Sequence, residues 1–369
     1  MGSSSFGPFM SRWVKKSYPD VKSDLCTCFI ERGFSLAKDR GYAAMITMQS
    51  WMFLGSFEKM RSSLIGSKSI LSMLHLGPRA FDAIGGEVVN VTADVVYNGR
   101  AACEGAYVRL VEINGSDAKR KKALEAIDDP GCGRFYRRDA ETFKQIPGTP
   151  IAYSASDALL DAFGLKKGLG IVADFKEGVT TGDNDRYLRF WFEPEQTHVG
   201  PRGGVFRDRG HYWGYCNKGG QYRKWYGNLL HVMDWTDDGA LLSSFPGCSF
   251  RSPLFQGREG GTYSNISSGL FSIRFSPEGT LSESKGAMLY TNCLLSVLAF
   301  MNSCVANAAL QFLCPTLDFK SGPLKTLPFI GASSSEKTIE RIATDCIKLS
   351  KLDWDSFETS WDFKRHPLL

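Results

Sequence analysis

The chain has 369 residues, of which 43% are hydrophobic and 22% charged, with 38 glycines and 12% aromatic residues. This length suits roughly two domains of about 150 residues and a core that needs no disulfide or metal, so the composition excludes a disordered chain and a fibre. Forty-four Lys and Arg residues against 39 Asp and Glu give a net charge of +5, which permits a nucleic-acid partner without indicating one.

The cysteines and the apolar stretches point to a protein inside the cell. The ten cysteines are scattered, with no Cys-x-x-Cys pair and no zinc-type spacing with histidine, so we expect a reduced, cytoplasmic protein. The most apolar long stretch, residues 287–314, contains three asparagines and a glutamine and is too polar for a membrane span. Residues 1–6 resemble neither a secretion signal nor a myristoylation site. The sequence therefore predicts no membrane partner.

The first hundred residues alternate between helical and strand patterns. Residues 24–37 fit a helix with an acidic first turn, and the unbroken apolar run 42–47 is typical of a strand buried on both faces of a parallel sheet. Residues 51–60 fit a second amphipathic helix, residues 70–76 a strand, and residues 88–97 a β-rich segment ending in an Asn-Gly turn. This order predicts the later half of a doubly wound α/β sheet, in which ligands bind beyond the carboxyl ends of the strands.

The character of the chain then changes. A basic run at residues 119–122 is followed by an acidic Pro-Gly turn, and we place a domain boundary near residue 115. Residues 175–286 are rich in glycine and aromatics with short alternating runs, which indicates a mixed, loop-rich domain. Residues 288–313 are helical by composition, and prolines interrupt the connector to a last helix at residues 336–349.

One window combines positive charge with aromatic rings. Residues 202–226 contain six basic side chains, seven aromatic ones and a single acid, Asp208. Cations bind phosphates and aromatic rings stack on bases, so the window fits a nucleic-acid surface. A solvated, glycine-rich loop region whose aromatics form a local core fits the same composition. The residues alone leave both interpretations open.

No catalytic motif stands out elsewhere. The sequence has no Walker phosphate loop, no GxGxxG and no GxSxG elbow, and its five histidines show no i, i+4 pairing. Residues 183–185, Asp-Asn-Asp, lack the later ligands of a calcium loop and are interpreted as a turn. The residues thus indicate half of an α/β domain joined to a binding domain, without a catalytic constellation.

Motifs typical of two different domains occur in order along the chain. They are GYAAMITMQSWMFL at 41–54, HLGPRAF at 75–81, GGEVV at 85–89, GVTTGDNDR at 178–186, KGGQYRKWYGN at 218–228, PTLDF at 315–319 and DWDSFETSWDF at 353–363. Together they resemble γ-class adenine-specific DNA methyltransferases, most closely the large methyltransferase of type 1 BREX phage-defence systems, which is related to type IIG restriction-modification enzymes.

The resemblance implies three parts and an activity. Residues 1–115 would form the C-terminal half of a Rossmann-like methyltransferase sheet, residues 116–329 a mixed α/β target-recognition domain, and residues 330–369 a C-terminal helix and tail. The implied reaction is transfer of a methyl group from S-adenosylmethionine to N6 of an adenine flipped out of double-stranded DNA. Other phage-defence proteins are possible partners by the same resemblance.

The sequence also departs from the family. The cofactor-binding loop and the Asn-Pro-Pro-Tyr motif do not occur in it. In the family that motif is directly followed by a segment like Met1-Gly2, so the resemblance implies a C-terminal piece that needs an upstream half and is inactive alone. The alternatives are a DNA-binding recognition module without catalytic activity, and a decayed, poorly folded gene product whose half sheet exposes a strand edge.

The resemblance also assigns individual residues. Phe81 matches the ring that stacks on the flipped adenine, and Gln49, Ser50 and Trp51 match the wall of its pocket. The alternatives are a Phe81 that packs under the sheet edge and an ordinary helix start at residues 49–51. No residue is assigned to catalysis or to a metal. The DNA-binding residues implied are Arg186, Arg207, Arg209, Lys218, Gln221, Arg223, Lys224, Trp225 and Tyr226.

Overall fold

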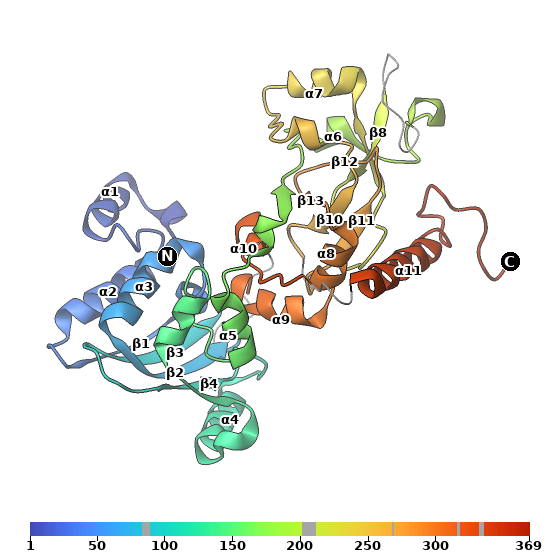
Figure 1. The fold of residues 1–369 in the computed structure, drawn as a ribbon. Coiled ribbons are helices and arrows are strands. Elements are labelled where there is room, and N and C mark those ends of the chain that lie inside the picture. The colour runs from blue at the N-terminus through green and yellow to red at the C-terminus, as the bar shows by residue number, and fades with distance from the viewer. Residues whose placement is uncertain (83–88, 201–211, 268, 316–317, 332–335) are drawn as a thin grey trace. The chain divides into compact units, whose positions relative to one another are not determined.

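The structure is a computed structural model that describes residues 1–82, 89–200, 212–267, 269–315, 318–331 and 336–369. It divides into two compact units, Met1–Leu165 and Lys166–Leu369. Figure 1 shows helices and strands in both units, in agreement with the predicted α/β class.

The first unit follows the predicted order of helix, strand, helix, strand, strand. The order is confirmed by α2, β1, α3, β2 and β3, but α3 begins only at Glu58, later than the helix predicted at residues 51–60, because short 3-10 turns at residues 49–52 and 55–57 come first. The elements of the unit are α1 (Pro8–Ser17), α2 (Leu25–Leu36), β1 (Tyr42–Met48), α3 (Glu58–Ser67), β2 (Ser69–Gly77), β3 (Val91–Tyr97), β4 (Gly105–Arg109), α4 (Ser116–Asp128), β5 (Phe135–Arg138) and α5 (Asp157–Gly164). Helix α2 begins where the acidic turn predicted it, because the Asp24 side chain accepts a hydrogen bond from the Cys26 N–H at 2.9 Å.

The five strands form one mixed sheet in the order β1-β3-β2-β4-β5. Strand β3 runs antiparallel to both of its neighbours, so β1 and β2 point the same way, and β4 is parallel to β2. The carboxyl ends of β1, β2 and β4 therefore lie at one edge of the sheet.

The first strand forms where it was predicted, but the prediction that it is buried on both faces of a parallel sheet is wrong. Among the described strands β1 pairs only with β3, and it does so antiparallel, so it is an edge strand. Its Tyr42 and Ile46 are 67% and 62% exposed. An unbroken apolar run does not specify its strand partners, and here the run belongs to an edge without a charge or a proline to block further pairing.

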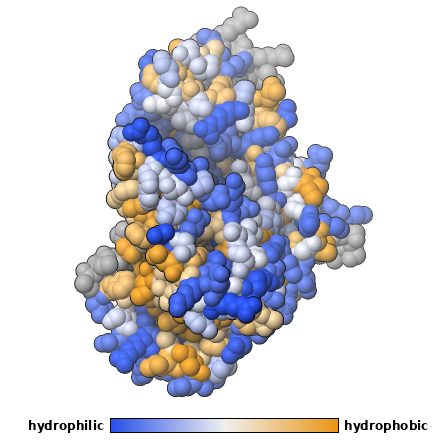
Figure 2. Space-filling view, turned by 90° about the vertical axis from the view of Figure 1, so that its left-hand side faces the viewer, coloured by the Kyte–Doolittle hydropathy of each residue, from blue (hydrophilic) through white to orange (hydrophobic). Residues whose placement is uncertain are grey.

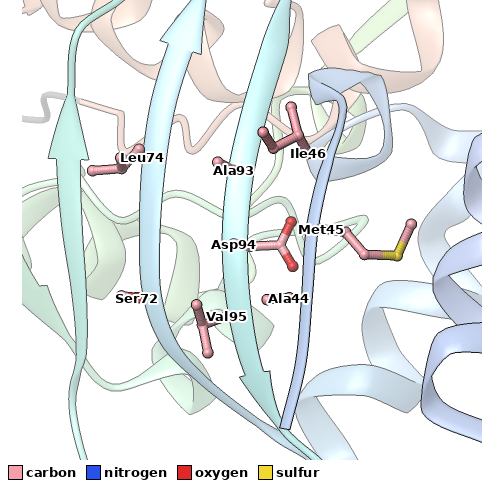
Figure 3. A pocket seen from close by; sticks show the side chains of 8 residues that line it. All are labelled: Ala44, Met45, Ile46, Ser72, Leu74, Ala93, Asp94 and Val95. Atoms are coloured by element: carbon pink, nitrogen blue, oxygen red, sulfur yellow. The ribbon is translucent and has the colours of Figure 1, made fainter. Parts of the chain in front are cut away.

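One face of this sheet is only partly covered. Helix α4 packs on it through Ala123 and Ala126, which share a core cluster with Val108 and Leu110. Beside α4, small and aliphatic side chains of β1, β2 and β3 line a hollow of about 310 Å³ (Figure 3). Figure 2 shows hydrophobic side chains exposed on the surface of the first unit.

The boundary predicted near residue 115 lies inside the first unit. It falls between β4 and α4, and the shared core cluster of these two elements shows that they belong to one compact body. Strand β5 also pairs with β4. The composition changes at this point because a surface helix begins there, and the compact body continues to Leu165.

The second unit holds two four-stranded sheets, β11-β10-β13-β6 and β12-β8-β9-β7. Its strands are β6 (Ala173–Lys176), β7 (Leu188–Phe190), β8 (Trp213–Asn217), β9 (His231–Asp234), β10 (Gly260–Ser264), β11 (Ile273–Ser276), β12 (Leu281–Ser282) and β13 (Gly286–Thr291). Its helices are α6 (Asn184–Tyr187), α7 (Ala240–Ser243), α8 (Leu294–Met301), α9 (Cys304–Leu313), α10 (Ser321–Lys325) and α11 (Glu336–Trp354). The short strands agree with the predicted mixed, loop-rich domain.

The segment predicted as helical from residue 288 begins instead with a strand. Residues 286–291 form β13, which pairs with β10 on one side and β6 on the other. Pairing on both sides overrides the helical composition of this stretch. Among the described helices none is long and apolar enough alone to span a bilayer; α8 and α9 reach that length and composition only as a pair, and they are bent by 69°.

Candidate functional site

Two of the predicted pocket residues lie at the same edge of the first sheet. Gln49 directly follows β1, and its N–H donates to the Asn90 carbonyl at 2.9 Å, just before β3 begins. Phe81 follows β2, which is parallel to β1. The sheet therefore brings Gln49 and Phe81 to the edge where open α/β sheets bind ligands.

The Gln49 side chain is held by a residue that the sequence did not single out. His75 Nε2 lies 2.7 Å from Gln49 Oε1, and His75 Nδ1 lies 2.7 Å from the Tyr153 hydroxyl. His75 is 8% exposed, and Tyr153 is buried with its ring stacked on Tyr107 at 5.0 Å between centroids. A side chain from β2 thus connects a core tyrosine to the residue that follows β1.

The surroundings of this cluster keep His75 neutral. Burial, with a smaller contribution from the Arg109 charge, lowers the pKa of His75 to about 4. Burial also raises the pKa of Tyr153. Arg109 donates to Glu112 at 2.6 Å and interacts with the Tyr153 hydroxyl. At neutral pH the imidazole therefore has one donor and one acceptor nitrogen.

Phe81 stands on a tethered turn. Phe81 is 42% exposed, which does not fit the alternative of a side chain packed under the sheet edge. The neighbouring Asp82 accepts hydrogen bonds from the Ser116 N–H at 3.2 Å and the Ser116 hydroxyl at 2.5 Å, at the start of α4. These bonds lower the pKa of Asp82 and fix the turn against the helix. The ring is thus available for stacking at this edge, and that role stays a prediction.

The residues after Gln49 form a short 3-10 helix, Gln49–Met52, as the alternative interpretation expected. Trp51 is 1% exposed, and its Nε1 donates to Thr47 Oγ1 at 3.0 Å. Trp51 is therefore a core residue beneath the edge and cannot form a wall that faces a ligand. Ser50 is half-buried and remains a candidate.

Arg61 of α3 fixes this segment from the core. The side chain is fully buried and donates to the carbonyls of Trp51 at 2.8 Å, Leu54 at 2.7 Å, Gly148 at 2.5 Å and Thr149 at 3.0 Å. Burial lowers the pKa of Arg61 to about 10, so the guanidinium stays charged at neutral pH. One side chain thus joins the turn after β1 to the loop before α5.

In the second unit, two of the basic residues expected to contact DNA, Arg223 and Lys224, are engaged in contacts within the protein. Arg223 donates to the Tyr226 carbonyl at 2.7 Å and to Asp353 at 2.6 Å, and it stacks on Trp354 at 5.1 Å from the ring centroid. Lys224 Nζ donates to the Asn302 carbonyl at 2.6 Å. These contacts tie the predicted DNA window to α8 and α11.

The remaining candidates divide by exposure. Tyr226 is buried and shares a cluster with Leu229 and Trp354, as the local-core alternative expected, and Trp225 is half-buried. Lys218 is half-buried, whereas Gln221 is exposed just after two glycines with positive φ, Gly219 and Gly220. Arg207 and Arg209 lie outside the described residues.

The turn predicted at residues 183–185 is instead the start of the short helix α6, which begins at Asn184. The Asp183 side chain accepts from the Arg186 N–H at 3.1 Å and caps α6. Arg186 is exposed beside the Tyr187 ring. Within the part of the chain that the structure describes, no group of three or more His, Cys, Asp or Glu side chains is arranged to hold a metal ion.

Comparison with known proteins adds relatives for both units. Residues 3–81 match the family model of the Eco57I restriction-modification methylase. The chain is 38% identical to the adenine-specific methyltransferase PglX of Lacticaseibacillus casei (strain Zhang) over 382 aligned residues, which cover all of this chain and 32% of that protein. It is 35% identical to the adenine-specific methyltransferase BrxX of Escherichia coli O9:H4 (strain HS), covering all of this chain and 30% of that protein.

The chain thus spans about a third of the length of these curated relatives. Among solved structures, the type IIL restriction-modification enzyme MmeI, determined in complex with DNA, superposes with a TM-score of 0.61. The match covers 98% of this chain and 49% of that chain at 11% sequence identity, so it concerns the fold. The predicted α/β methyltransferase-like fold is confirmed.

Proposed function

Because the chain is similar along its whole length to adenine-specific methyltransferases, as its motifs predicted, we propose that it belongs to a DNA methyltransferase that modifies the amino group of adenine. The observation that carries the proposal is the 38% identity to PglX over all residues, since it includes both compact units. The wider role that we propose is phage defence or restriction-modification in the cytoplasm, where the DNA substrate is found.

In this proposal the first unit binds the extruded base and the second unit binds the DNA duplex. Extruding an adenine costs a few kcal/mol, and stacking on an aromatic ring offsets part of that cost. Phe81 and Gln49 of the first unit lie at one sheet edge and suit the extruded base, one through its ring and the other through its amide. The second unit would bind the duplex, with Arg186, Lys218 and Gln221 among its contacts.

This sequence contains no loop that matches a binding site for the methyl donor. S-adenosylmethionine is the donor of this enzyme class, but the sequence contains neither a glycine-rich cofactor loop nor the Asn-Pro-Pro-Tyr motif. We therefore assign no residue of this chain to the donor and expect no turnover by the chain alone. We propose that the donor site lies in the part of the protein that corresponds to the unmatched two thirds of the relatives.

The sheet of the first unit offers a place for that other part. Phe29 and Leu36 of α2, together with Tyr42 and Ile46 of β1, are 61 to 69% exposed on and beside the edge strand. An apolar edge of this kind readily accepts another strand. We propose that an upstream half, joined in one polypeptide or supplied separately, completes the sheet at β1.

The first test restores the catalytic half. The chain is joined to the upstream coding region of its gene, and methylation of adenine in duplex DNA is measured with and without S-adenosylmethionine. We expect donor-dependent methylation, and Phe81→Ala should lower kcat/KM by about ten- to a hundredfold, because base stacking contributes about 1 to 3 kcal/mol. Phe357→Ala, at a half-exposed ring in the C-terminal segment, is the matched control. A restored enzyme that never methylates adenine would end the proposal.

The second test examines the chain alone and separates a DNA-binding part from a chain without DNA contacts. Binding to a DNA duplex should weaken as salt increases, with a slope of about −0.9 per contacted phosphate in a plot of log K against log salt. Arg186→Ala should make this slope less steep by about one unit if Arg186 meets a phosphate. Lys348→Ala, an exposed charge on α11, is expected to leave it unchanged. A binding constant independent of salt argues against DNA contact by these cations.

A further inference from the structure

We infer that His75 is a positioning residue that fixes the Gln49 side chain, so that the Gln49 amide N–H donates a hydrogen bond to a ring nitrogen of the extruded adenine. The inference rests on the proposed function. It adds a base-reading residue and a residue that orients it, neither of which carries a catalytic role by itself.

His75 links Gln49 to the core of the first unit. His75 bonds to Gln49 on one side and to Tyr153 on the other, both at 2.7 Å, and the three residues come from separate parts of the first unit. His75 sits in the row Thr47–Thr92–His75, which crosses β1, β3 and β2. The imidazole therefore lies across β3 and reaches the residue that follows β1.

The hydrogen bonds of the cluster all point in the same direction. Gln49 Oε1 can only accept, so His75 Nε2 carries the hydrogen of the neutral ring. His75 Nδ1 is then the acceptor for the Tyr153 hydroxyl, and the guanidinium of Arg109 interacts with the same hydroxyl. The donors thus run in one direction from Arg109 through Tyr153 and His75 to Gln49.

The amide nitrogen of Gln49 is the last donor in this row of hydrogen bonds. Its oxygen is occupied by His75, and among the described residues the nitrogen has no hydrogen-bond partner. Gln49 is half-buried at the carboxyl ends of the strands, where open α/β sheets bind ligands, so its N–H groups are available to donate a hydrogen bond to a ligand. The ring nitrogens of adenine accept hydrogen bonds and never donate them, so they suit this donor. A base edge that presents N–H groups would leave the Gln49 N–H without an acceptor.

Without His75 the amide would rotate. An Asn or Gln side chain exchanges its oxygen and nitrogen by a half turn, and only its hydrogen-bond partners decide which orientation persists. Removal of His75 would therefore present the oxygen to the base for part of the time. The effect would fall on recognition of the base, while binding of the duplex would be unchanged.

The experiment uses the enzyme with its upstream half restored and oligonucleotides whose target adenine is replaced by its 1-deaza, 3-deaza or 7-deaza analogue. For the unaltered enzyme, one of the three analogues should lower kcat/KM about tenfold or more relative to adenine, which corresponds to about 1.4 kcal/mol. Gln49→Leu should lose a similar factor on adenine and lose nothing further on that analogue. His75→Ala should reduce the discrimination in the same way, with duplex affinity unchanged.

A second measurement does not depend on activity or on a variant. In the chain labelled with nitrogen-15, the shifts of His75 should show the neutral tautomer with hydrogen on Nε2 between pH 6 and 8. Hydrogen on Nδ1 would overturn the inference, because Gln49 would then have to turn its nitrogen toward the ring.

The outcomes separate the inference from the proposed function. If adenine is methylated but all three analogues react at the same rate, or if Gln49→Leu keeps the discrimination, the inference is wrong and the enzyme remains. If the restored enzyme methylates no adenine, both are overturned. A purely structural role of His75 predicts lower thermal stability for His75→Ala with the analogue discrimination retained.

Discussion

Arg61→Ala is expected to lower the free energy of unfolding of the first unit by about 3 to 5 kcal/mol, because it removes the side-chain donor from four carbonyls and opens a cavity. Arg61 is fully buried, and four carbonyls from two segments accept from its guanidinium. The Trp51 and Leu54 carbonyls lie after β1, whereas those of Gly148 and Thr149 lie before α5. The variant should therefore loosen both segments.

The measurement is urea unfolding of the chain, followed by hydrogen exchange of the backbone amides of the first unit, with Arg120→Ala as the matched control. Arg120 is an exposed arginine on α4, and its removal should change the unfolding free energy by less than about 0.5 kcal/mol. Arg61→Lys keeps the positive charge but not the planar fork, so we expect an intermediate loss. A loss below about 1 kcal/mol for Arg61→Ala would mean that water satisfies the four carbonyls.

Local features of the first unit were predictable from the sequence. The position of α2 followed from the acidic residue expected in its first turn and from apolar periodicity; the structure places that residue, Asp24, one position earlier, as the N-cap. The sheet edge on which Gln49 and Phe81 lie followed from the order of helices and strands. These features depend on residues that are close together in the sequence, so the sequence pattern of a short segment is enough to predict them.

The contacts that build the site depend on distant residues. His75 looks like a lone histidine, because its partners Gln49 and Tyr153 are 26 and 78 positions away. Arg61 sits among helix-forming residues and bonds to carbonyls 87 and 88 positions away. The composition of the basic window also cannot show that Arg223 is held by Asp353, which lies 130 positions further on.

Asp94→Asn is expected to stabilise the first unit at neutral and alkaline pH and to change nothing near pH 4. Asp94 lies in β3 between Met45 and Met73, is 8% exposed, and its Oδ1 has no hydrogen-bond partner among the described residues. Figure 3 shows its carboxyl group projecting from β3 toward β1. Burial raises the pKa of Asp94 from 3.8 to about 7.

The sign follows from the protons bound in each state. Between about pH 4 and 7 the folded chain keeps a proton on Asp94 that the unfolded chain has released, so the free energy of unfolding falls as pH rises through this range. A difference of about three pKa units corresponds to at most about 4 kcal/mol, reached above pH 7. Asn has no charge to bury, so the free energy of unfolding of the variant does not decrease for this reason as pH rises.

His75 acts in the opposite direction. Its pKa falls from 6.5 to about 4 on folding, so the unfolded chain binds the extra proton and the free energy of unfolding rises with pH between 4 and 6.5. The difference corresponds to at most about 3 kcal/mol. In the unaltered chain the two slopes largely cancel over this range, and a flat pH profile would conceal both groups.

Asp94→Asn removes the pH dependence that is due to Asp94, so that the pH dependence due to His75 becomes measurable. The variant should gain stability steadily from pH 4.5 to 6.5, while the unaltered chain changes little, and at pH 8 the variant should exceed it by several kcal/mol. Urea unfolding at pH 4.5, 6.5 and 8 measures this, with Asp161→Asn at an exposed carboxylate of α5 as the control. Parallel profiles for Asp94→Asn and the unaltered chain would show that Asp94 is solvated in the folded state, whereas divergence with rising pH identifies it as the destabilising charge beneath the sheet.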